Sequence, residues 1–136
     1  MIVVDVNILV ALELETDVSK DARRIAGLDP DWRLPVLWRS EFSNALRNFH
    51  RAGKIGRDEA LVLLRGALGR YAAAETRTDE ELSLGLSMDR GLTFYDASYL
   101  DLAVQLGTVL VTEDKELIKK SRGDAMSMSS WLSSKA

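Results

Sequence analysis

The N-terminal segment Ile2–Val10 constrains the fold of this chain more than any other stretch. It is dense in β-branched residues, which is typical of a strand that is buried on both faces in a parallel sheet covered by helices. One carboxylate, Asp5, lies in its middle. Because burying an unpaired charge is costly, Asp5 requires a cation, hydrogen-bond donors or a proton. Ligands of open α/β sheets gather where strands end, and Asp5 lies about where this strand would stop. It therefore either belongs to a site or caps the next turn.

Short apolar strands alternate with amphipathic helices along the rest of the chain. Further strands are expected at 32–34, 108–111 and 126–128, and helices at 9–14, 20–28, 36–52, 57–71, 78–90, 94–106, 115–120 and around Trp131. This alternation predicts an α/β fold, a three-layer α/β/α sandwich with a central, mainly parallel sheet. The length of 136 residues predicts one domain over residues 1–136.

Composition excludes several classes of site. The chain has no cysteine and one histidine, which excludes disulfides, thiolate metal sites and a histidine-rich zinc site. No apolar run approaches the roughly 20 residues that span a bilayer, so a soluble, cytoplasmic protein without membrane association is expected. The formal net charge of −3 argues against a protein that coats DNA.

Glu41 is the second acid that the pattern places near the core. At about 100° per residue, it lies at the margin of the buried face of helix 36–52. The lone histidine, His50, comes out about 180° from Glu41 on the same helix. We therefore expect His50 on the surface and not as a catalytic partner of Glu41.

Helix 94–106 carries two acids on different faces. Asp96 lies in the first turn and is expected to point inward, where the helix dipole favours an anion. Thr93 offers an alternative, in which Asp96 only completes a capping box. Asp101 lies about 140° from Asp96 and is expected to face solvent.

Asp114 follows the strand 108–111 as Asp5 follows the first strand, or it serves only as the N-cap of the next helix. Four carboxylates at one sheet edge would repel one another and raise their pKa values unless divalent cations neutralise them. Oxygen-only ligands fit Mg²⁺ or Mn²⁺, not zinc. Such cations activate water and stabilise the leaving oxygen in phosphodiester hydrolysis. Our hypothesis is that Asp5, Asp96 and Asp114 hold the principal metal, with Glu41 joining directly or through water.

The motifs around these acids resemble those of the PIN-domain ribonucleases, and most closely the VapC toxins of prokaryotic VapBC toxin–antitoxin pairs. They are Val4–Leu9 (VDVNIL), Arg39–Leu46 (RSEFSNAL), Tyr95–Ala103 (YDASYLDLA) and Val111–Asp114 (VTED), in this order over nearly the whole chain. The resemblance implies a PIN-like fold and a Mg²⁺- or Mn²⁺-dependent endoribonuclease that acts as the toxin of a type II pair. It also implies a homodimer and inhibition by a small cognate VapB-type antitoxin.

The resemblance carries over to individual residues. It implies a metal-binding, catalytic quartet of carboxylates: Asp5, Glu41, Asp96 and Asp114. Thr112 matches the family hydroxyl that orients the last acid, and Asn7 matches a polar position beside the first. Glu113 is expected to point away from Asp114, with no role assigned.

A strip of basic residues follows Glu41, beside the acid-rich second half of the chain. Its members are candidates for binding the RNA backbone: Arg47, Arg51, Lys54 and Arg57. Two solvated helix faces would give the same pattern.

Two alternatives to a nuclease follow from the same residues. A phosphatase of the haloacid dehalogenase type also begins with a strand-end aspartate, but it needs a second aspartate where this chain has Asn7. A catalytically silent PIN-like scaffold that binds RNA or a partner would keep the acids without turnover.

Overall fold

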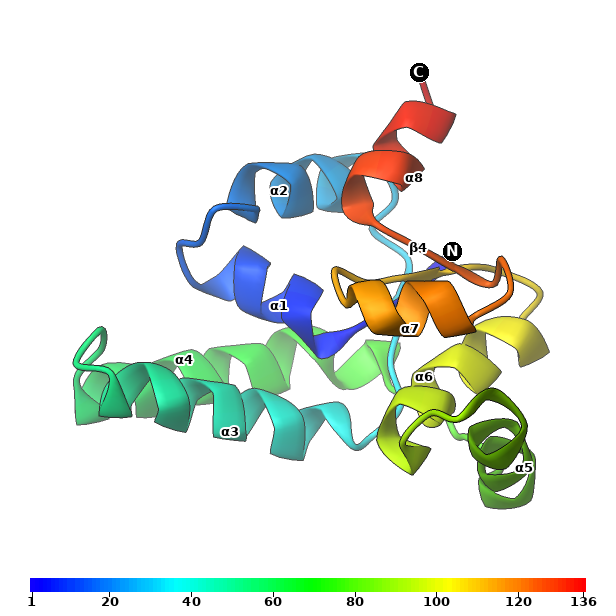
Figure 1. Ribbon diagram of the computed structural model, residues 1–136. Helices are drawn as coiled ribbons and strands as arrows, with labels where there is room; N and C mark the ends of the chain where they lie inside the picture. The colour runs from blue at the N-terminus through cyan, green and yellow to red at the C-terminus, as the bar shows by residue number, and fades with distance from the viewer.

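A computed structural model describes residues 1–136 as strands and helices in alternation (Figure 1). The elements in chain order are β1 (Ile2–Val4), α1 (Val6–Glu13), α2 (Ser19–Leu28), β2 (Trp32–Arg33), α3 (Trp38–Arg51), α4 (Arg57–Tyr71), the 3₁₀ turn η1 (Ala72–Ala74), α5 (Glu80–Arg90), α6 (Phe94–Gln105), β3 (Leu110–Val111), α7 (Lys115–Lys120), β4 (Ala125–Met126) and α8 (Met128–Ser134).

The four strands form one sheet in the order β2-β1-β3-β4, and every pair is parallel. Helix α6 packs against β1 and β3, with α5 outside it, while α1, α2 and α8 pack together on the other side (Figure 1). The predicted α/β/α sandwich with a parallel sheet is confirmed. Because parallel strands end at the same edge, the residues that follow β1 and β3 become neighbours.

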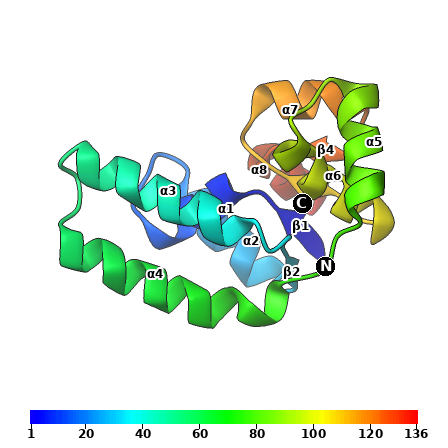
Figure 2. The same cartoon turned by 90° about the horizontal axis from the view of Figure 1, so that it is seen from below.

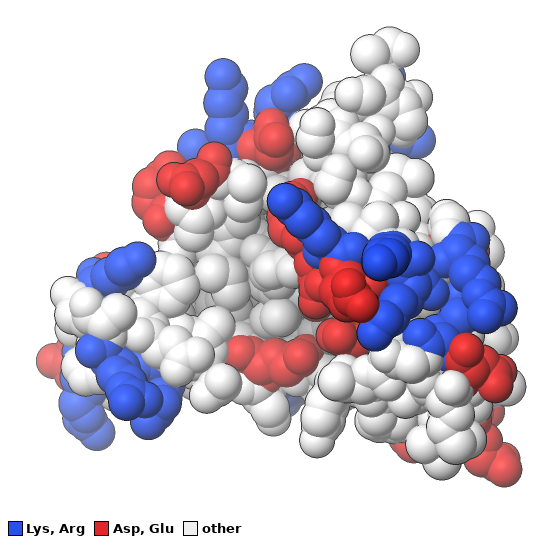
Figure 3. All heavy atoms as spheres, viewed as in Figure 1, with Lys and Arg blue, Asp and Glu red and all other residues white.

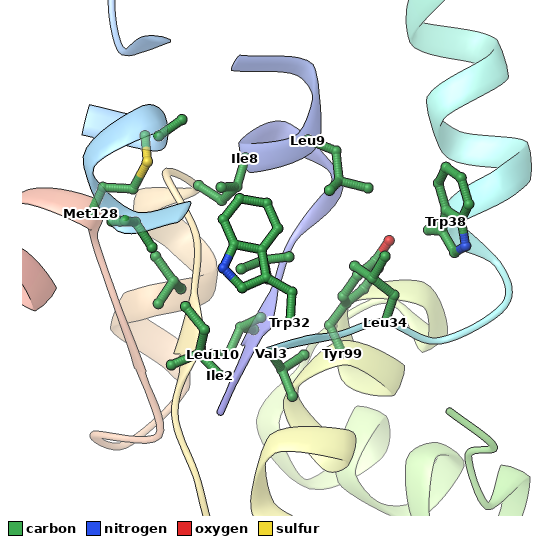
Figure 4. Packing of buried hydrophobic residues seen from close by; sticks show 14 of the residues in the cluster. Ile2, Val3, Ile8, Leu9, Trp32, Leu34, Trp38, Tyr99, Leu110 and Met128 are labelled. Atoms are coloured by element: carbon green, nitrogen blue, oxygen red, sulfur yellow. The ribbon is translucent and has the colours of Figure 1, made fainter. Parts of the chain in front are cut away.

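The hydrophobic core lies between the sheet and its helices (Figure 4). Val3 and Leu110 of the central strands are fully buried, as are Ile8 of α1 and Tyr99 of α6. The edge strand β2 contributes Trp32, whose ring stacks on Tyr71 of α4. The sheet is therefore covered on both faces, which explains the dense apolar sequence of its strands.

Helices α3 and α4 form an antiparallel hairpin that extends away from the sheet (Figures 1 and 2). Its base is fixed to the domain by two carboxylates. Glu13 at the end of α1 accepts hydrogen bonds from Arg70 (2.9 Å) and Tyr71 (2.7 Å) of α4. Glu75 accepts one from the indole of Trp38 (2.9 Å). These contacts hold the base of the hairpin against the end of α1 and the segment that follows η1.

Two expected element boundaries shift. The strand that begins at Ile2 ends at Val4, and helix α1 already starts at Val6. Asp5 causes this change, because its side chain accepts the backbone N–H of Val6 as an N-cap. Similarly, the helix expected from residue 78 begins at Glu80, with Asp79 as its N-cap.

The prediction that Asp101 faces solvent is wrong. Its side chain is buried and accepts hydrogen bonds from Ser83 Oγ (3.1 Å) and Gln105 Nε2 (3.3 Å). Ser83 belongs to α5, which packs on this face of α6. A single-helix projection identifies the face toward the sheet but not the face that a second layer of helices covers. No helix combines the length and apolarity that a bilayer crossing requires.

Candidate active site

Asp5 and Thr112 meet where β1 and β3 end. The backbone N–H of Asp5 continues the sheet by donating to the carbonyl of Val111 (3.0 Å), which sets the two residues side by side. Thr112 Oγ1 donates to Asp5 Oδ2 (2.7 Å) and accepts the backbone N–H of Asp114 (3.1 Å). The buried hydroxyl of Thr112 thus orients Asp5 and fixes the turn that carries Asp114. Asp5 is therefore both an N-cap and part of a polar cluster.

Asn7 completes this polar cluster from the first turn of α1. Its Nδ2 donates to Thr112 Oγ1 (3.2 Å) and lies 3.4 Å from Asp5 Oδ2. Its Oδ1 accepts the backbone N–H of Glu113 (3.3 Å). Asn7 therefore joins the loop after β1 to the loop after β3, which is the supporting position that the sequence predicts for it.

Glu41 lies in the first turn of α3 and is bound by α6. Tyr99 Oη donates to Glu41 Oε1 (2.7 Å), and the Tyr99 ring is fully buried. Figure 4 shows the Tyr99 hydroxyl on the side of the core toward α3. Glu41 is half-buried, as its helical angle predicts. The remaining oxygen, Oε2, accepts no hydrogen bond within the chain.

Asp96 and Asp114 approach from the starts of α6 and α7. Thr93 Oγ1 accepts the backbone N–H of Asp96 (3.1 Å) as the N-cap of α6, and a hydrogen bond from the Thr93 side chain lowers the pKa of the Asp96 carboxyl. Asp114 Oδ1 caps α7 by accepting the N–H groups of Glu116 (3.0 Å) and Leu117 (3.1 Å). Both acids therefore lie at the start of a helix, and Asp114 Oδ2 accepts no hydrogen bond within the chain.

The pKa values of Asp5, Glu41 and Asp96 show that these carboxylates lie in one electrostatic environment, to which the charge of Asp114 contributes. Burial raises the pKa of Asp5 to about 6, against the stabilising hydrogen bonds, and the charges of Asp96 and Asp114 add to the rise. Burial raises the pKa of Glu41 to about 7, with Asp5 and Asp96 contributing, while the hydrogen bond from Tyr99 lowers it. Burial and the charge of Asp114 also raise the pKa of Asp96. The fold thus brings each of the four predicted acids within electrostatic range of two others, with Asp5 and Asp96 linking Glu41 to Asp114.

The donor set fits a hard divalent cation in charge and chemistry. No arginine or lysine forms an ion pair with any of the four acids. Their oxygens are the ligands that Mg²⁺ and Mn²⁺ prefer. As the side chains stand, however, no three acidic groups are close enough together to hold one ion.

The basic residues predicted to bind RNA lie elsewhere. Arg47 and Arg51 belong to the last half of α3, Lys54 to the turn and Arg57 to the start of α4. This turn is the far end of the hairpin in Figures 1 and 2, and blue atoms mark it at the left of Figure 3. The red patch at the centre of Figure 3 is separated from it by a white surface. His50 is exposed here, as predicted.

Sequence reasoning missed the roles of two residues. Tyr99 lies three residues after Asp96 on α6, and this spacing on one helix face was the available signal. Glu113 turns away from Asp114, as predicted, but it has a structural role. Its carboxylate accepts the backbone N–H of Met128 (2.9 Å) at the start of α8.

A family model for the PIN domain matches residues 2–123. The chain belongs to the PIN domain family. The match includes β1, β3 and all four acids of the candidate site, so the family's domain and the polar edge of this sheet coincide.

This PIN domain is similar to two proteins of Pyrobaculum aerophilum. Exonuclease VapC9 is 40% identical over 83 residues, and the match spans 61% of this chain and 62% of VapC9. Ribonuclease VapC3 is 29% identical over 122 residues, or 88% of this chain and 93% of VapC3.

Two solved structures share the fold. PAE2754 from Pyrobaculum aerophilum superposes with a TM-score of 0.76 at 29% identity, covering 98% of this PIN domain and 94% of that chain. FitAcB from Neisseria gonorrhoeae superposes with a TM-score of 0.71 at 14% identity, covering 94% and 98%. The second likeness concerns the fold alone.

Proposed function

We propose that this protein is a Mg²⁺- or Mn²⁺-dependent ribonuclease. The observation that carries the proposal is the set of four carboxylates, unpaired with any cation, at the carboxyl edge of a PIN-domain sheet. Mutual repulsion and burial make this arrangement unfavourable on its own, and a divalent cation would remove the penalty. The similarity to proteins named as a ribonuclease and an exonuclease supports the same class of chemistry.

Each polar residue of the site has a role in this proposal. Asp5, Asp96 and Asp114 would hold the cation, with Glu41 joining directly or through water. When bound, such a cation lowers the pKa of water and stabilises the leaving oxygen of a phosphodiester. The chain's own contribution is to fix the ligands: Thr112 and Asn7 orient Asp5, and Tyr99 holds Glu41 Oε1. Cleavage would leave a 3′ hydroxyl and a 5′ phosphate.

The test is cleavage of labelled RNA with Mg²⁺, with Mn²⁺ and with a chelator. Asp5→Asn and Asp96→Asn should each abolish cleavage, because each removes one charge from the cation's ligands, and both variants should remain folded. Asp101→Asn is the matched control, since it removes an acid from α6 outside the site. Manganese should raise the melting temperature of the parent but not of Asp96→Asn. Undiminished turnover in the two site variants would overturn the assignment.

A separate substrate is needed to distinguish endonucleolytic from exonucleolytic cleavage, because one similar protein is named an exonuclease and the other a ribonuclease. We propose endonucleolytic cleavage. A covalently closed circular RNA has no ends, so its linearisation by the parent protein, and not by Asp96→Asn, would support an endonuclease. Degradation of linear RNA alone would contradict it.

We also propose a toxin role, with a small VapB-type antitoxin and a homodimer, from the similarity to proteins named VapC. Co-expression with the product of a short neighbouring reading frame should yield a complex in which RNA cleavage is suppressed. Light scattering on the purified protein should give twice the 15.1 kDa chain mass. A monomer would contradict the homodimer, and cleavage that persists in the complex would contradict the role of the antitoxin.

One observation favours a second candidate function, a silent scaffold that binds RNA or a partner. No three acids are arranged to hold an ion as the side chains stand. In that case manganese would not raise the melting temperature, and RNA would bind without being cut.

A further inference from the structure

Three cations on and after α7 have no partner within the chain. Lys115 and Lys119 on the helix, and Arg122 in the turn that follows, are exposed and form no ion pair or side-chain hydrogen bond. The neighbouring Lys120, in contrast, has partners within the chain. Lys120 pairs with Glu116 (3.1 Å) and donates to the carbonyl of Gly91 (3.0 Å). We call Lys115, Lys119 and Arg122 the α7 basic patch.

The α7 basic patch borders the acidic site. Lys115 directly follows Asp114, the N-cap of α7, and Lys119 lies on the same face one turn later. Buried Leu117 fixes which face of the helix packs on the domain. Figure 3 shows blue and red atoms side by side over α7, which carries Glu116 as well as these cations. Positive and negative charge therefore meet at the edge of the site.

This juxtaposition suits a polyanion whose phosphate must enter an acidic pocket. The four carboxylates repel a phosphodiester, and unpaired cations beside them would offset that repulsion. The hairpin cations are less well placed for this purpose. Arg51 lies ten residues after Glu41 on α3, which is about 15 Å along the helix axis.

We propose that the α7 basic patch holds the phosphates that flank the cleaved bond, so that single-stranded RNA enters the site along α7. This inference rests on the ribonuclease proposed above. The hairpin cations Arg47, Arg51 and Arg57 then contact only the distal part of a long RNA.

The experiment measures binding of labelled single-stranded RNA over a range of salt concentrations. All proteins carry Asp96→Asn, so that binding is separated from cleavage. One variant adds Lys115→Ala, Lys119→Ala and Arg122→Ala. Each lost phosphate contact should lower the slope of log affinity against log salt by about 0.7, or about 2 for the set. In the active protein, the same three changes should raise KM at least tenfold with little change in kcat.

Two charge-matched variants serve as controls. Arg47→Ala, Arg51→Ala and Arg57→Ala change the charge at the hairpin, and Lys20→Ala, Arg23→Ala and Arg24→Ala change it on exposed α2. The hairpin set should lower the salt slope by less than half as much as the α7 set does, and the α2 set should leave the slope unchanged. Equal loss in all three would show a diffuse charge effect and overturn the inference, as would a larger loss from the hairpin set.

Failure of the inference and failure of the ribonuclease proposal give different results. If the parent cleaves RNA and the α7 set leaves KM and the salt slope unchanged, only the inference is wrong. If the parent never cleaves RNA but the α7 set loses binding, the surface is correct and the ribonuclease proposal is wrong.

Discussion

Tyr99 Oη lies 2.7 Å from Glu41 Oε1 and donates a hydrogen bond to it, joining α6 to α3 across the candidate site. The donor is fully buried and the acceptor is half-buried. The two residues are 58 positions apart in the chain. This bond is the direct connection between the acid that α3 contributes and the helix that carries Asp96.

Removing the Tyr99 hydroxyl should loosen Glu41 without removing any carboxylate. Tyr99→Phe should weaken Mn²⁺ binding and RNA cleavage by about 10- to 100-fold, the usual effect of losing a group that orients a metal ligand. Calorimetric titration with Mn²⁺ would measure the affinity. Phe42→Leu, at the buried position that follows Glu41 on α3, is a control for core packing. Equal Mn²⁺ affinity in Tyr99→Phe and the parent would contradict the positioning role.

The stability and activity of the protein should depend on the hydroxyl of Thr112 but not on its methyl group. Thr112→Val leaves Asp5 Oδ2 and the backbone N–H of Asp114 without this partner in a buried position, which should lower the free energy of unfolding by about 1–3 kcal/mol. Thr112→Ser keeps the hydroxyl and should retain most of both stability and activity. Denaturant unfolding compares the two. Similar losses in both variants would indicate that packing, and not the hydrogen bonds, is the cause.

The raised pKa of Asp5 predicts how stability depends on pH. The folded value is about 6 against an ordinary value of 3.8, so the folded state binds this proton more tightly than the unfolded chain does. Between these values stability falls as pH rises, because the buried carboxylate must ionise. Glu41, with a pKa of about 7, extends the fall to neutral pH.

Asp5→Asn should therefore gain stability over the parent as pH rises from about 4 to about 7, by at most about 3 kcal/mol in metal-free buffer. Urea unfolding at several pH values in the presence of a chelator measures this difference. Mg²⁺ or Mn²⁺ at neutral pH should reverse this stability difference, because the cation stabilises the parent with Asp5 ionised. A difference that is constant over this range would mean that the Asp5 pKa is not raised in the folded protein.

The buried pair of Asp101 and Ser83 should matter for stability alone. Ser83→Ala leaves Asp101 Oδ2 without its donor from α5 and should lower the free energy of unfolding by about 1–3 kcal/mol. Cleavage per folded molecule should not change, because the pair lies outside the acidic site. Ser129→Ala, on the exposed surface of α8, is the control and should be neutral. A loss of specific activity in Ser83→Ala would link α5 to the site.

Much of the fold could be predicted because local chemistry specifies it. The bounds of α4 and α7 agree with the periodicity, and Gly91, with a φ of 64°, ends α5 as its position suggests. Parallel strands followed from the dense β-branched runs, since only burial on both faces favours such sequences. The first boundary differs from the expectation, because Asp5 both ends the strand and begins the helix as its N-cap.

The sequence alone determined which acids the chain can bring to the sheet edge, because strand ends and first helical turns fix where Asp5, Asp96 and Asp114 emerge. Tertiary structure alone decided what surrounds them. The bond from Tyr99 to Glu41 and the burial of Asp101 under α5 both depend on helices that meet only after folding. The physical reason is that helical and strand periods define the orientation of each side chain on its own element. Which partner reaches that side chain depends on the packing of whole elements, which no single period encodes.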